Sequence, residues 1–205
     1  MDAVSWSKIK LLREPSGRVR YLTEEEEARL MAVLPADADR QRIKVLLQTG
    51  LRKSEFSGLR WKDIDLRAGV ITIPRSKNGE TRHVPMTSAI RVFLSRLPRP
   101  LDASALVFPN SVGTRDYRWA TRTFLAAIRA AQIDNFRFHD LRHTFASRLA
   151  MEAVDLLAIK DLGGWKSLAM VQRYAHLSPE HHRDAVERLV TRATVAKANP
   201  AFGAE

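Results

Sequence analysis

Apolar residues recur at helical spacing over most of the chain and alternate with polar residues in one stretch. Residues 1–20 follow neither pattern and are predicted to be a linker or arm that packs on something else. Thr23 followed by four glutamates predicts a helix start, because a hydroxyl caps free N–H groups and carboxylates favour the positive end of the helix dipole. Further helices are predicted over Ala38–Thr49, Lys53–Ser57, Ala89–Arg96, Tyr117–Ala131, Leu141–Glu152, Leu156–Leu162, Leu168–Tyr174 and Pro179–Val190.

The alternating stretch predicts a small antiparallel sheet. Residues 69–74 and 80–86 form two extended runs on either side of Asn78-Gly79, a pair typical of tight hairpin turns. A short strand near Ile64-Asp65 is expected to join them. The predicted fold class is therefore mainly α with a small antiparallel β-sheet (α+β), built on one core.

Composition narrows the class of protein. The chain has 205 residues, of which 45% are apolar and 28% charged, as expected for one folded domain rather than a disordered chain. Cysteine is absent, which excludes disulfides, cysteine-ligated zinc, iron–sulfur clusters and thiol catalysis. No apolar run approaches the roughly 20 residues of a membrane span, and no signal peptide is evident. A cytoplasmic location without membrane association is expected.

Positive charge is concentrated in the middle of the chain. The net charge is +11, and residues 41–100 alone carry 13 basic and 4 acidic residues. Such a surface favours a polyanionic partner such as nucleic acid, although a solubilising or arginine-rich bias is an alternative. The candidate contacts to such a partner in this region are Arg60, Lys62, Arg75 and Arg82.

Three segments carry side chains suited to a phosphate group. Arg52 lies between two predicted helices, where backbone N–H groups and a guanidinium can meet a phosphate; an Arg–Glu surface pair is the alternative. Lys77 beside the hairpin turn can reach into a groove, although most lysines on such turns are merely solvated. His139 and Arg142 are one helical turn apart, so an imidazole and a bidentate donor can point the same way, which suits phosphoryl transfer.

Two other patterns have ordinary alternatives. His139 and His143 have the spacing of a metal pair, but Arg142 would add a cation and no third ligand is near, so His143 is expected to be a packed, hydrogen-bonded helix residue. Trp165 follows two glycines and precedes Tyr174 by nine residues. This spacing can bring an indole N–H and a phenol together, or it can simply place two aromatic residues in the core.

Together and in this order, these segments resemble the catalytic domain of the tyrosine recombinases, the phage-integrase group. The match runs from about Tyr21 to Val190 and comprises a Gly-Leu-Arg segment, a hairpin lysine, a His-x-x-Arg, a Gly-Trp position and a tyrosine. The resemblance implies the tyrosine-recombinase catalytic-domain fold, with a tryptophan where many relatives have histidine. The active residues it implies are Arg52, Lys77, His139, Arg142, Trp165 and Tyr174.

The implied partner is double-stranded DNA, which makes the four basic residues named above candidate DNA contacts. The implied reaction is a break and rejoining of this DNA that needs neither a metal nor a nucleotide cofactor. Tyr174 attacks a phosphodiester and forms a 3′-phosphotyrosyl bond, which conserves the bond energy. Arg52 and Arg142 would clamp the nonbridging oxygens, where charge grows. His139 is the expected proton acceptor and Lys77 the expected donor to the leaving oxygen, whereas Trp165 can only donate a hydrogen bond.

The resemblance also carries expectations about organisation and partners. The catalytic domain is expected over residues 21–192, with a flexible tail over 193–205 and without the N-terminal core-binding domain of such relatives. A C-terminal segment around Val186 and Leu189 is expected to join protomers as a dimer or tetramer on DNA, the free chain being a monomer; a helix packed on its own chain is the alternative. A topoisomerase-like relaxation of DNA and a catalytically silent DNA-binding regulator are the competing functions.

Overall fold

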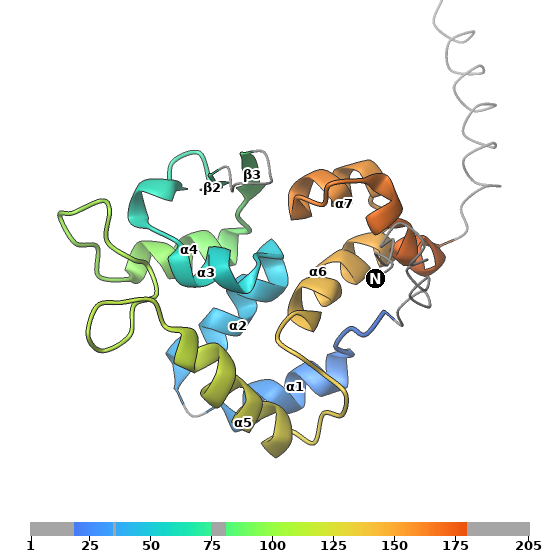
Figure 1. Cartoon of the computed structure of the whole chain (residues 1–205), viewed down its shortest axis with the longest axis horizontal. Helices are drawn as coiled ribbons and strands as arrows, with labels where there is room; N and C mark the ends of the chain where they lie inside the picture. The colour runs from blue at the N-terminus through green and yellow to red at the C-terminus, as the bar shows by residue number, and fades with distance from the viewer. Residues whose placement is uncertain (1–18, 35, 75–80, 180–205) are drawn as a thin grey trace, which may run out of the picture.

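The computed structural model describes residues 19–34, 36–74 and 81–179, which form a set of short helices and one small sheet at the upper edge of the view (Figure 1). The α-helices are α1 (Glu24–Val33), α2 (Asp37–Thr49), α3 (Lys53–Gly58), α4 (Ser88–Arg96), α5 (Phe124–Ala130), α6 (Asp140–Met151) and α7 (Leu156–Gly163). Tighter or wider turns form η2 (Trp61–Asp63), η3 (Trp119–Thr123), η4 (Leu168–Met170) and η5 (Gln172–Leu177). This architecture confirms the predicted fold class.

The sheet has the predicted antiparallel hairpin with one added strand. Its strands are β1 (Ile64–Asp65), β2 (Val70–Ile73) and β3 (Arg82–Pro85), in the order β1-β2-β3. Ile71 pairs with Val84, and both side chains are buried, so one face of the sheet covers the core. The hairpin tip, residues 75–80, lies outside the described residues, and the predictions for Arg75 and Lys77 lie there with it.

The helix boundaries follow from local chemistry that the sequence displays. Thr23 Oγ1 accepts a hydrogen bond from Glu26 N at 3.2 Å, and the Glu26 carboxylate accepts one from Thr23 N at 3.1 Å, which confirms the predicted cap of α1. Helix α2 ends at Gly50, whose φ of 60° lies in the left-handed region that glycine adopts without strain.

Two predicted helices take a different form. The span 117–131 begins as a π-helical turn, η3, before α5 continues it. The span 168–174 forms two 3₁₀ turns rather than one α-helix. In a 3₁₀ turn, side chains three residues apart lie on the same side, which lets Val171 and Tyr174 enter the core together. Most of the predicted helix 179–190, together with the tail after it, lies outside the described residues.

Helix α6 lies between the two hydrophobic clusters of the described chain. It packs against α2 on one side and against α7 and η5 on the other (Figure 1). The larger cluster joins α1, α2, the sheet, α4 and α5. The smaller cluster consists of Ala146, Ala150, Ile159, Trp165, Val171 and Tyr174.

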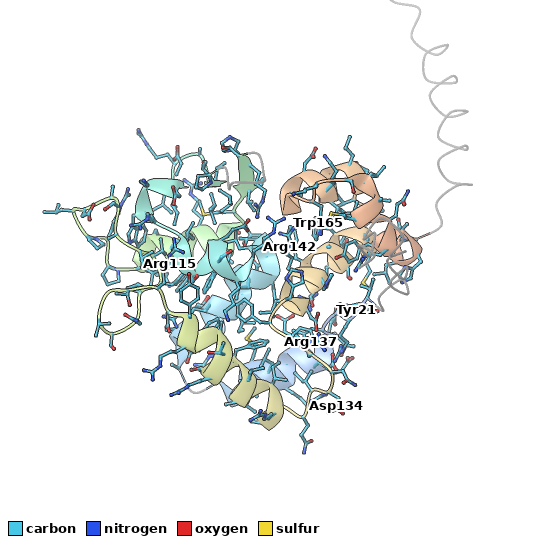
Figure 2. The ribbon with its side chains drawn as sticks, viewed as in Figure 1. Tyr21, Arg115, Asp134, Arg137, Arg142 and Trp165 are labelled. Carbon is cyan, nitrogen blue, oxygen red and sulfur yellow. The ribbon has the colours of Figure 1, made fainter. Side chains whose placement is uncertain are left out.

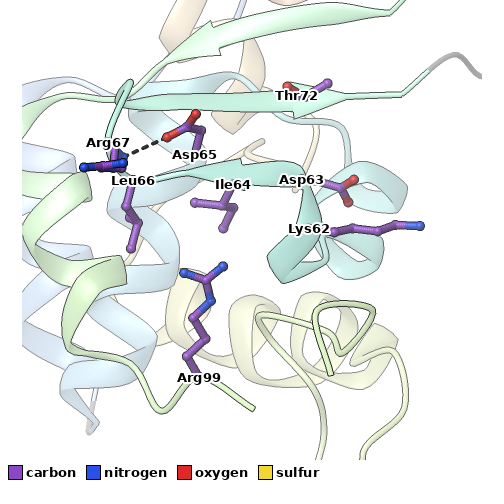
Figure 3. A pocket seen from close by; sticks show the side chains of 8 residues that line it. All are labelled: Lys62, Asp63, Ile64, Asp65, Leu66, Arg67, Thr72 and Arg99. Atoms are coloured by element: carbon purple, nitrogen blue, oxygen red, sulfur yellow. Dashed lines mark hydrogen bonds between the residues drawn. The ribbon is translucent and has the colours of Figure 1, made fainter. Parts of the chain in front are cut away.

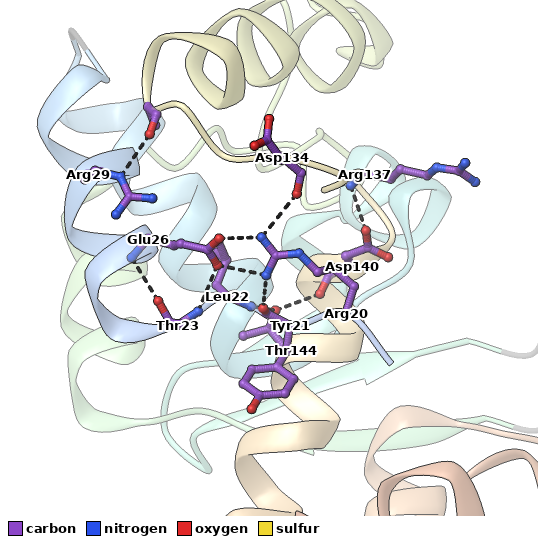
Figure 4. A network of polar contacts seen from close by, with 11 residues as sticks. Arg20, Tyr21, Leu22, Thr23, Glu26, Arg29, Asp134, Arg137, Asp140 and Thr144 are labelled. Atoms are coloured by element: carbon purple, nitrogen blue, oxygen red, sulfur yellow. Dashed lines mark hydrogen bonds and ion pairs between the residues drawn. The ribbon is translucent and has the colours of Figure 1, made fainter. Parts of the chain in front are cut away.

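A polar network ties the N-terminal segment to the start of α6 (Figure 4). Leu22 N donates to Thr144 Oγ1 at 3.0 Å, and this hydroxyl donates to Asp140 O at 2.7 Å. Arg20 forms an ion pair with Glu26 and donates to Asp134 O at 3.3 Å. The first turn of α6 is thereby fixed from the side opposite α7. Among the described helices, none is both long and apolar enough to cross a membrane.

Candidate active site

Arg142 is the most buried charged side chain of the predicted site. It projects from the first turns of α6 and is 2% exposed. Its Nη1 donates to Gly50 O at 2.7 Å, and its guanidinium carbon lies 3.9 Å from the centre of the Trp165 ring (Figure 2). Its Nη2 is buried and has no hydrogen-bond partner among the described residues. One face of this guanidinium is therefore held by protein, and one donor remains available.

The environment of Arg142 is strongly cationic. Burial, together with the positive charges of Arg52 and Arg82, lowers the pKa of its guanidinium to about 9. The group stays protonated at pH 7. The guanidinium groups of Arg52, Arg82 and Arg142 thus lie close together, and binding of an anion there would reduce their mutual repulsion.

Arg52 lies at the start of α3, directly after the Gly50-Leu51 turn. Its Nη1 donates to Glu55 Oε1 at 2.7 Å and its Nη2 donates to Gly164 O at 2.6 Å, while the side chain stays 40% exposed. The Arg–Glu pair weighed as the ordinary alternative is therefore present. It coexists with the placement of Arg52 close enough to Arg142 for its charge to lower the pKa of that group.

Glu55 accepts hydrogen bonds from two arginines. Arg82 donates to its two oxygens at 2.9 and 2.7 Å, and Arg52 N donates to Oε2 at 2.8 Å. Burial raises the pKa of this carboxyl, but the hydrogen bonds and charge of Arg82, with those of Arg52, outweigh it and lower the pKa to about 2. Glu55 is therefore ionised at neutral pH and neutralises one of the three cations.

The predicted DNA contacts are dispersed. The Arg82 side chain is 9% exposed, and its guanidinium is bound by Glu55 and Leu162 O. In this conformation Arg82 is therefore not the exposed DNA contact that was predicted. Arg60 donates to Ser104 O. Lys62 is exposed and lines an open hollow of about 520 Å³ with Arg67 and Arg99 (Figure 3). Of the predicted catalytic residues that the structure describes (Arg52, His139, Arg142, Trp165 and Tyr174), none lines this hollow.

Trp165 links the arginine cluster to Tyr174. Helix α7 ends at Gly164, whose φ of 68° turns the chain so that the indole enters the smaller cluster, where it is 8% exposed. One face of the indole meets Arg142, and the ring meets Tyr174 edge to face with the centres 5.9 Å apart. The indole is thus both a core residue and a wall of the site.

Tyr174 is fully buried, and its hydroxyl is directed to His143. It is 0% exposed, and its hydroxyl oxygen lies 2.5 Å from Nδ1 of His143. Burial raises the pKa of Tyr174 to about 12, although Arg173 and Arg142 oppose the rise. Burial also lowers the pKa of His143 to about 4, with a smaller contribution from the ring of His139. Both groups are therefore neutral at pH 7, and the phenol can donate to Nδ1.

This arrangement differs from the expected one in two respects. The partner of Tyr174 is His143 rather than His139, because His143 is one turn further along α6, where this helix packs on η5. His139 is exposed, and partial burial with the charge of Arg142 lowers its pKa. The phenol also lies fully buried in the smaller cluster. The described structure brings together Arg52, Arg142 and Trp165, and the indole of Trp165 contacts the ring of Tyr174.

The inward direction of the Arg82 side chain could have been predicted from strand alternation, although the charge pattern favoured an exposed DNA contact. Arg82 and Val84 are two residues apart on β3, so their side chains share one face of the sheet. Val84 is buried, and strand alternation therefore places Arg82 on the inward face as well. For the pairing of His143 with Tyr174 we find no comparable signal.

Comparison with known proteins identifies the family. Residues 20–181 match the model of the phage integrase family. The chain belongs to this family. It is 34% identical to the shufflon-specific DNA recombinase of Escherichia coli over 82% of this chain and 44% of that protein. It is also 34% identical to the integrase of Salmonella phage P22 over 84% of this chain and 48% of that protein. The chain thus spans about half the length of these curated relatives.

A solved catalytic domain has the same fold. The catalytic domain of bacteriophage HP1 integrase superposes with a TM-score of 0.67 and 27% identity, over 83% of this chain and 95% of that domain. This match, which covers nearly all of the HP1 domain, confirms the prediction of a tyrosine-recombinase catalytic-domain fold.

Proposed function

We propose that this chain is the catalytic domain of a site-specific DNA recombinase that cleaves and rejoins DNA through a covalent bond to Tyr174. The observation that carries the proposal is the buried, unpartnered Nη2 of Arg142 beside the half-exposed guanidinium of Arg52. A buried donor without a partner is unfavourable, and a charge-assisted bond to an anionic oxygen would satisfy it. The family membership and the names of the relatives support DNA as the source of that anion.

Charge balance within the cluster supports a phosphodiester. Arg52, Arg82 and Arg142 contribute three positive charges, and Glu55 neutralises one of them. Negative charge grows on the nonbridging oxygens when a phosphodiester is attacked, and preorganised guanidinium groups stabilise it without reorganisation. Arg52 and Arg142 are placed for this role. Trp165 packs between the guanidinium of Arg142 and the smaller cluster.

The proposed step balances without a cofactor. Tyr174 Oη forms a bond to phosphorus as the bond from phosphorus to the 5′ oxygen breaks, so one phosphoester replaces another. The phenolic proton leaves to a base, predicted to be His139, and the 5′ oxygen takes a proton, predicted to come from Lys77. Because Tyr174 is fully buried in this structure, its hydroxyl must become accessible before it can reach a phosphodiester. A metal-independent reaction remains a prediction.

The protomer contacts on DNA also remain predictions. Association as a dimer or tetramer is assigned to residues after 179, which lie outside the described residues. The predicted catalytic domain, residues 21–192, contains every candidate catalytic side chain.

A nicked suicide substrate, which releases the leaving strand after cleavage, tests the assignment of the nucleophile. Incubated in EDTA, the chain should form a protein–DNA adduct that survives denaturing electrophoresis, and Tyr174→Phe should form none. DNA affinity of the variant should stay within about three-fold, because the arginines are untouched. Tyr21→Phe, which alters a tyrosine outside the smaller cluster, is the matched control and should form the adduct as the unaltered chain does. An adduct with Tyr174→Phe would disprove the assignment.

A further inference from the structure

We propose that Arg82 is a positioning residue of this active site, acting through Glu55 to fix the guanidinium of Arg52, rather than a contact to DNA. The inference rests on the proposed function and deepens it. It assigns a role to the side chain through which β3, α3 and the turn after α7 are connected.

The first observation is the geometry of the Arg82–Glu55 pair. Two nitrogens of one guanidinium donate to the two oxygens of one carboxylate, at 2.9 and 2.7 Å. Such a paired contact fixes the plane of the carboxylate as well as its position, because the guanidinium is flat and rigid. The Arg82 side chain is 9% exposed and that of Glu55 is 15% exposed, so water competes little for either group.

The second observation is what the fixed carboxylate then holds. Glu55 accepts from the backbone N of Arg52 at 2.8 Å and from its Nη1 at 2.7 Å. Both the start of α3 and the direction of the Arg52 guanidinium are therefore set by one carboxylate. Without Arg82, the described structure would hold this carboxylate only through the backbone N and the Nη1 of Arg52, the residue that it positions.

The third observation lies at the other end of Arg82. Its Nε donates to Leu162 O at 3.1 Å, two residues before the Gly164 carbonyl that accepts from Arg52. A Cβ at Gly164 would lie 2.8 Å from Cδ of Arg82, so the arginine crosses this turn in direct contact with the backbone. The same turn delivers Trp165 to the face of Arg142. Arg82 therefore connects the surroundings of both arginines that are proposed to clamp the phosphate.

These contacts separate Arg82 from a phosphate contact. Three of its five N–H donors are engaged by protein, and its side chain is far less exposed than that of Arg52. The loss of a side chain that binds phosphate weakens DNA binding and reduces its salt dependence. Loss of a positioning side chain instead slows the chemical step after DNA is bound, since small displacements of a clamp cost large factors in rate.

The test compares Arg82→Lys and Arg82→Met with the unaltered chain. Single-turnover cleavage of the suicide substrate is measured at saturating protein, and DNA affinity is measured separately over a range of salt concentrations. Both variants should cleave about 10- to 100-fold more slowly, with affinity within about three-fold and an unchanged salt slope. Lysine should not restore the rate, because it keeps the charge but lacks the planar fork. Arg129→Lys, at an exposed arginine at the end of α5, is the matched control and should cleave normally.

A double-mutant cycle with Glu55→Gln shows whether Arg82 acts through Glu55. The rate of the double variant Arg82→Met with Glu55→Gln should match that of Glu55→Gln alone, because the path is already broken. Multiplicative losses would contradict the inference, as would normal cleavage by Arg82→Lys or a loss confined to DNA affinity. If the unaltered chain forms no adduct, the proposed function fails, and the inference fails with it. If the unaltered chain cleaves and Arg82→Lys cleaves equally well, only the inference fails.

Discussion

Acidification should destabilise this domain through His143. Its ring is held neutral in the fold, with a pKa lowered by burial from 6.5 to about 4. Between these values the unfolded chain binds nearly one proton that the folded chain does not, so the free energy of unfolding falls as the pH decreases through this window. Linkage gives a loss of about 2 kcal/mol from this residue between pH 7 and pH 5. His139, whose pKa is also lowered, contributes in the same direction.

Urea unfolding followed by tryptophan fluorescence at pH 7, 6 and 5 measures the effect. The loss of stability on acidification should be about 2 kcal/mol smaller in His143→Gln than in the unaltered chain. Tyr174→Phe should keep most of the loss, because burial rather than the hydroxyl is the leading cause of the lowered pKa. Equal losses in the unaltered chain and His143→Gln would refute the reasoning.

Two further predictions test the packing of helix α6 through two of its buried residues, Thr144 and Phe145. Thr144→Val should lower the free energy of unfolding by about 1–3 kcal/mol, because Leu22 N would lose its acceptor in a buried place; urea unfolding measures it, and an effect below about 0.5 kcal/mol would contradict the role of the network. Gly50→Ala should destabilise more than Gly69→Ala. Both glycines have positive φ, but a Cβ at Gly50 would lie 2.3 Å from the Phe145 ring and one at Gly69 would meet nothing within 4 Å. Equal midpoints of unfolding for the two variants would contradict this.

Local signals in the sequence predicted most of the described fold. The hydroxyl and glutamates after Tyr21 placed the start of α1, and Gly50 placed the end of α2. The extended runs on either side of Asn78-Gly79 predicted β2 and β3, and the short run at Ile64-Asp65 predicted β1. These features depend on neighbours within a few residues, which a single sequence displays directly. The 3₁₀ turns around Tyr174 depend on what packs beneath them, and the spacing of apolar residues was equally compatible with an α-helix.

The sequence predicted several of the side chains that the structure brings together in the candidate site, but not how each of them is buried or paired. Arg52, Arg142 and Trp165 lie together as their family positions imply, and Glu55 orients Arg52. The inward direction of Arg82 was available from strand alternation but was outweighed by the charge pattern. The burial of Tyr174 was one of two alternatives, because the spacing of Trp165 and Tyr174 is compatible both with a pair of core residues and with a shared site.

The position of Tyr174 sets an energetic condition on the proposed reaction. Moving a large aromatic side chain out of a buried cluster costs roughly 2–3 kcal/mol of apolar burial, and loss of its bond to His143 adds about 1 kcal/mol. A phosphodiester at Arg142 gains about 1.5–3 kcal/mol for each hydrogen bond to a charged group, starting with the donor that has no partner in the described structure. The two magnitudes are similar, so bound DNA can offset the release of the phenol. Cleavage would then depend on the arginine cluster in two ways, through stabilisation of the transition state and through the exposure of Tyr174. Substitutions of these arginines should therefore lower both the rate of cleavage and the fraction of DNA-bound protein that can react.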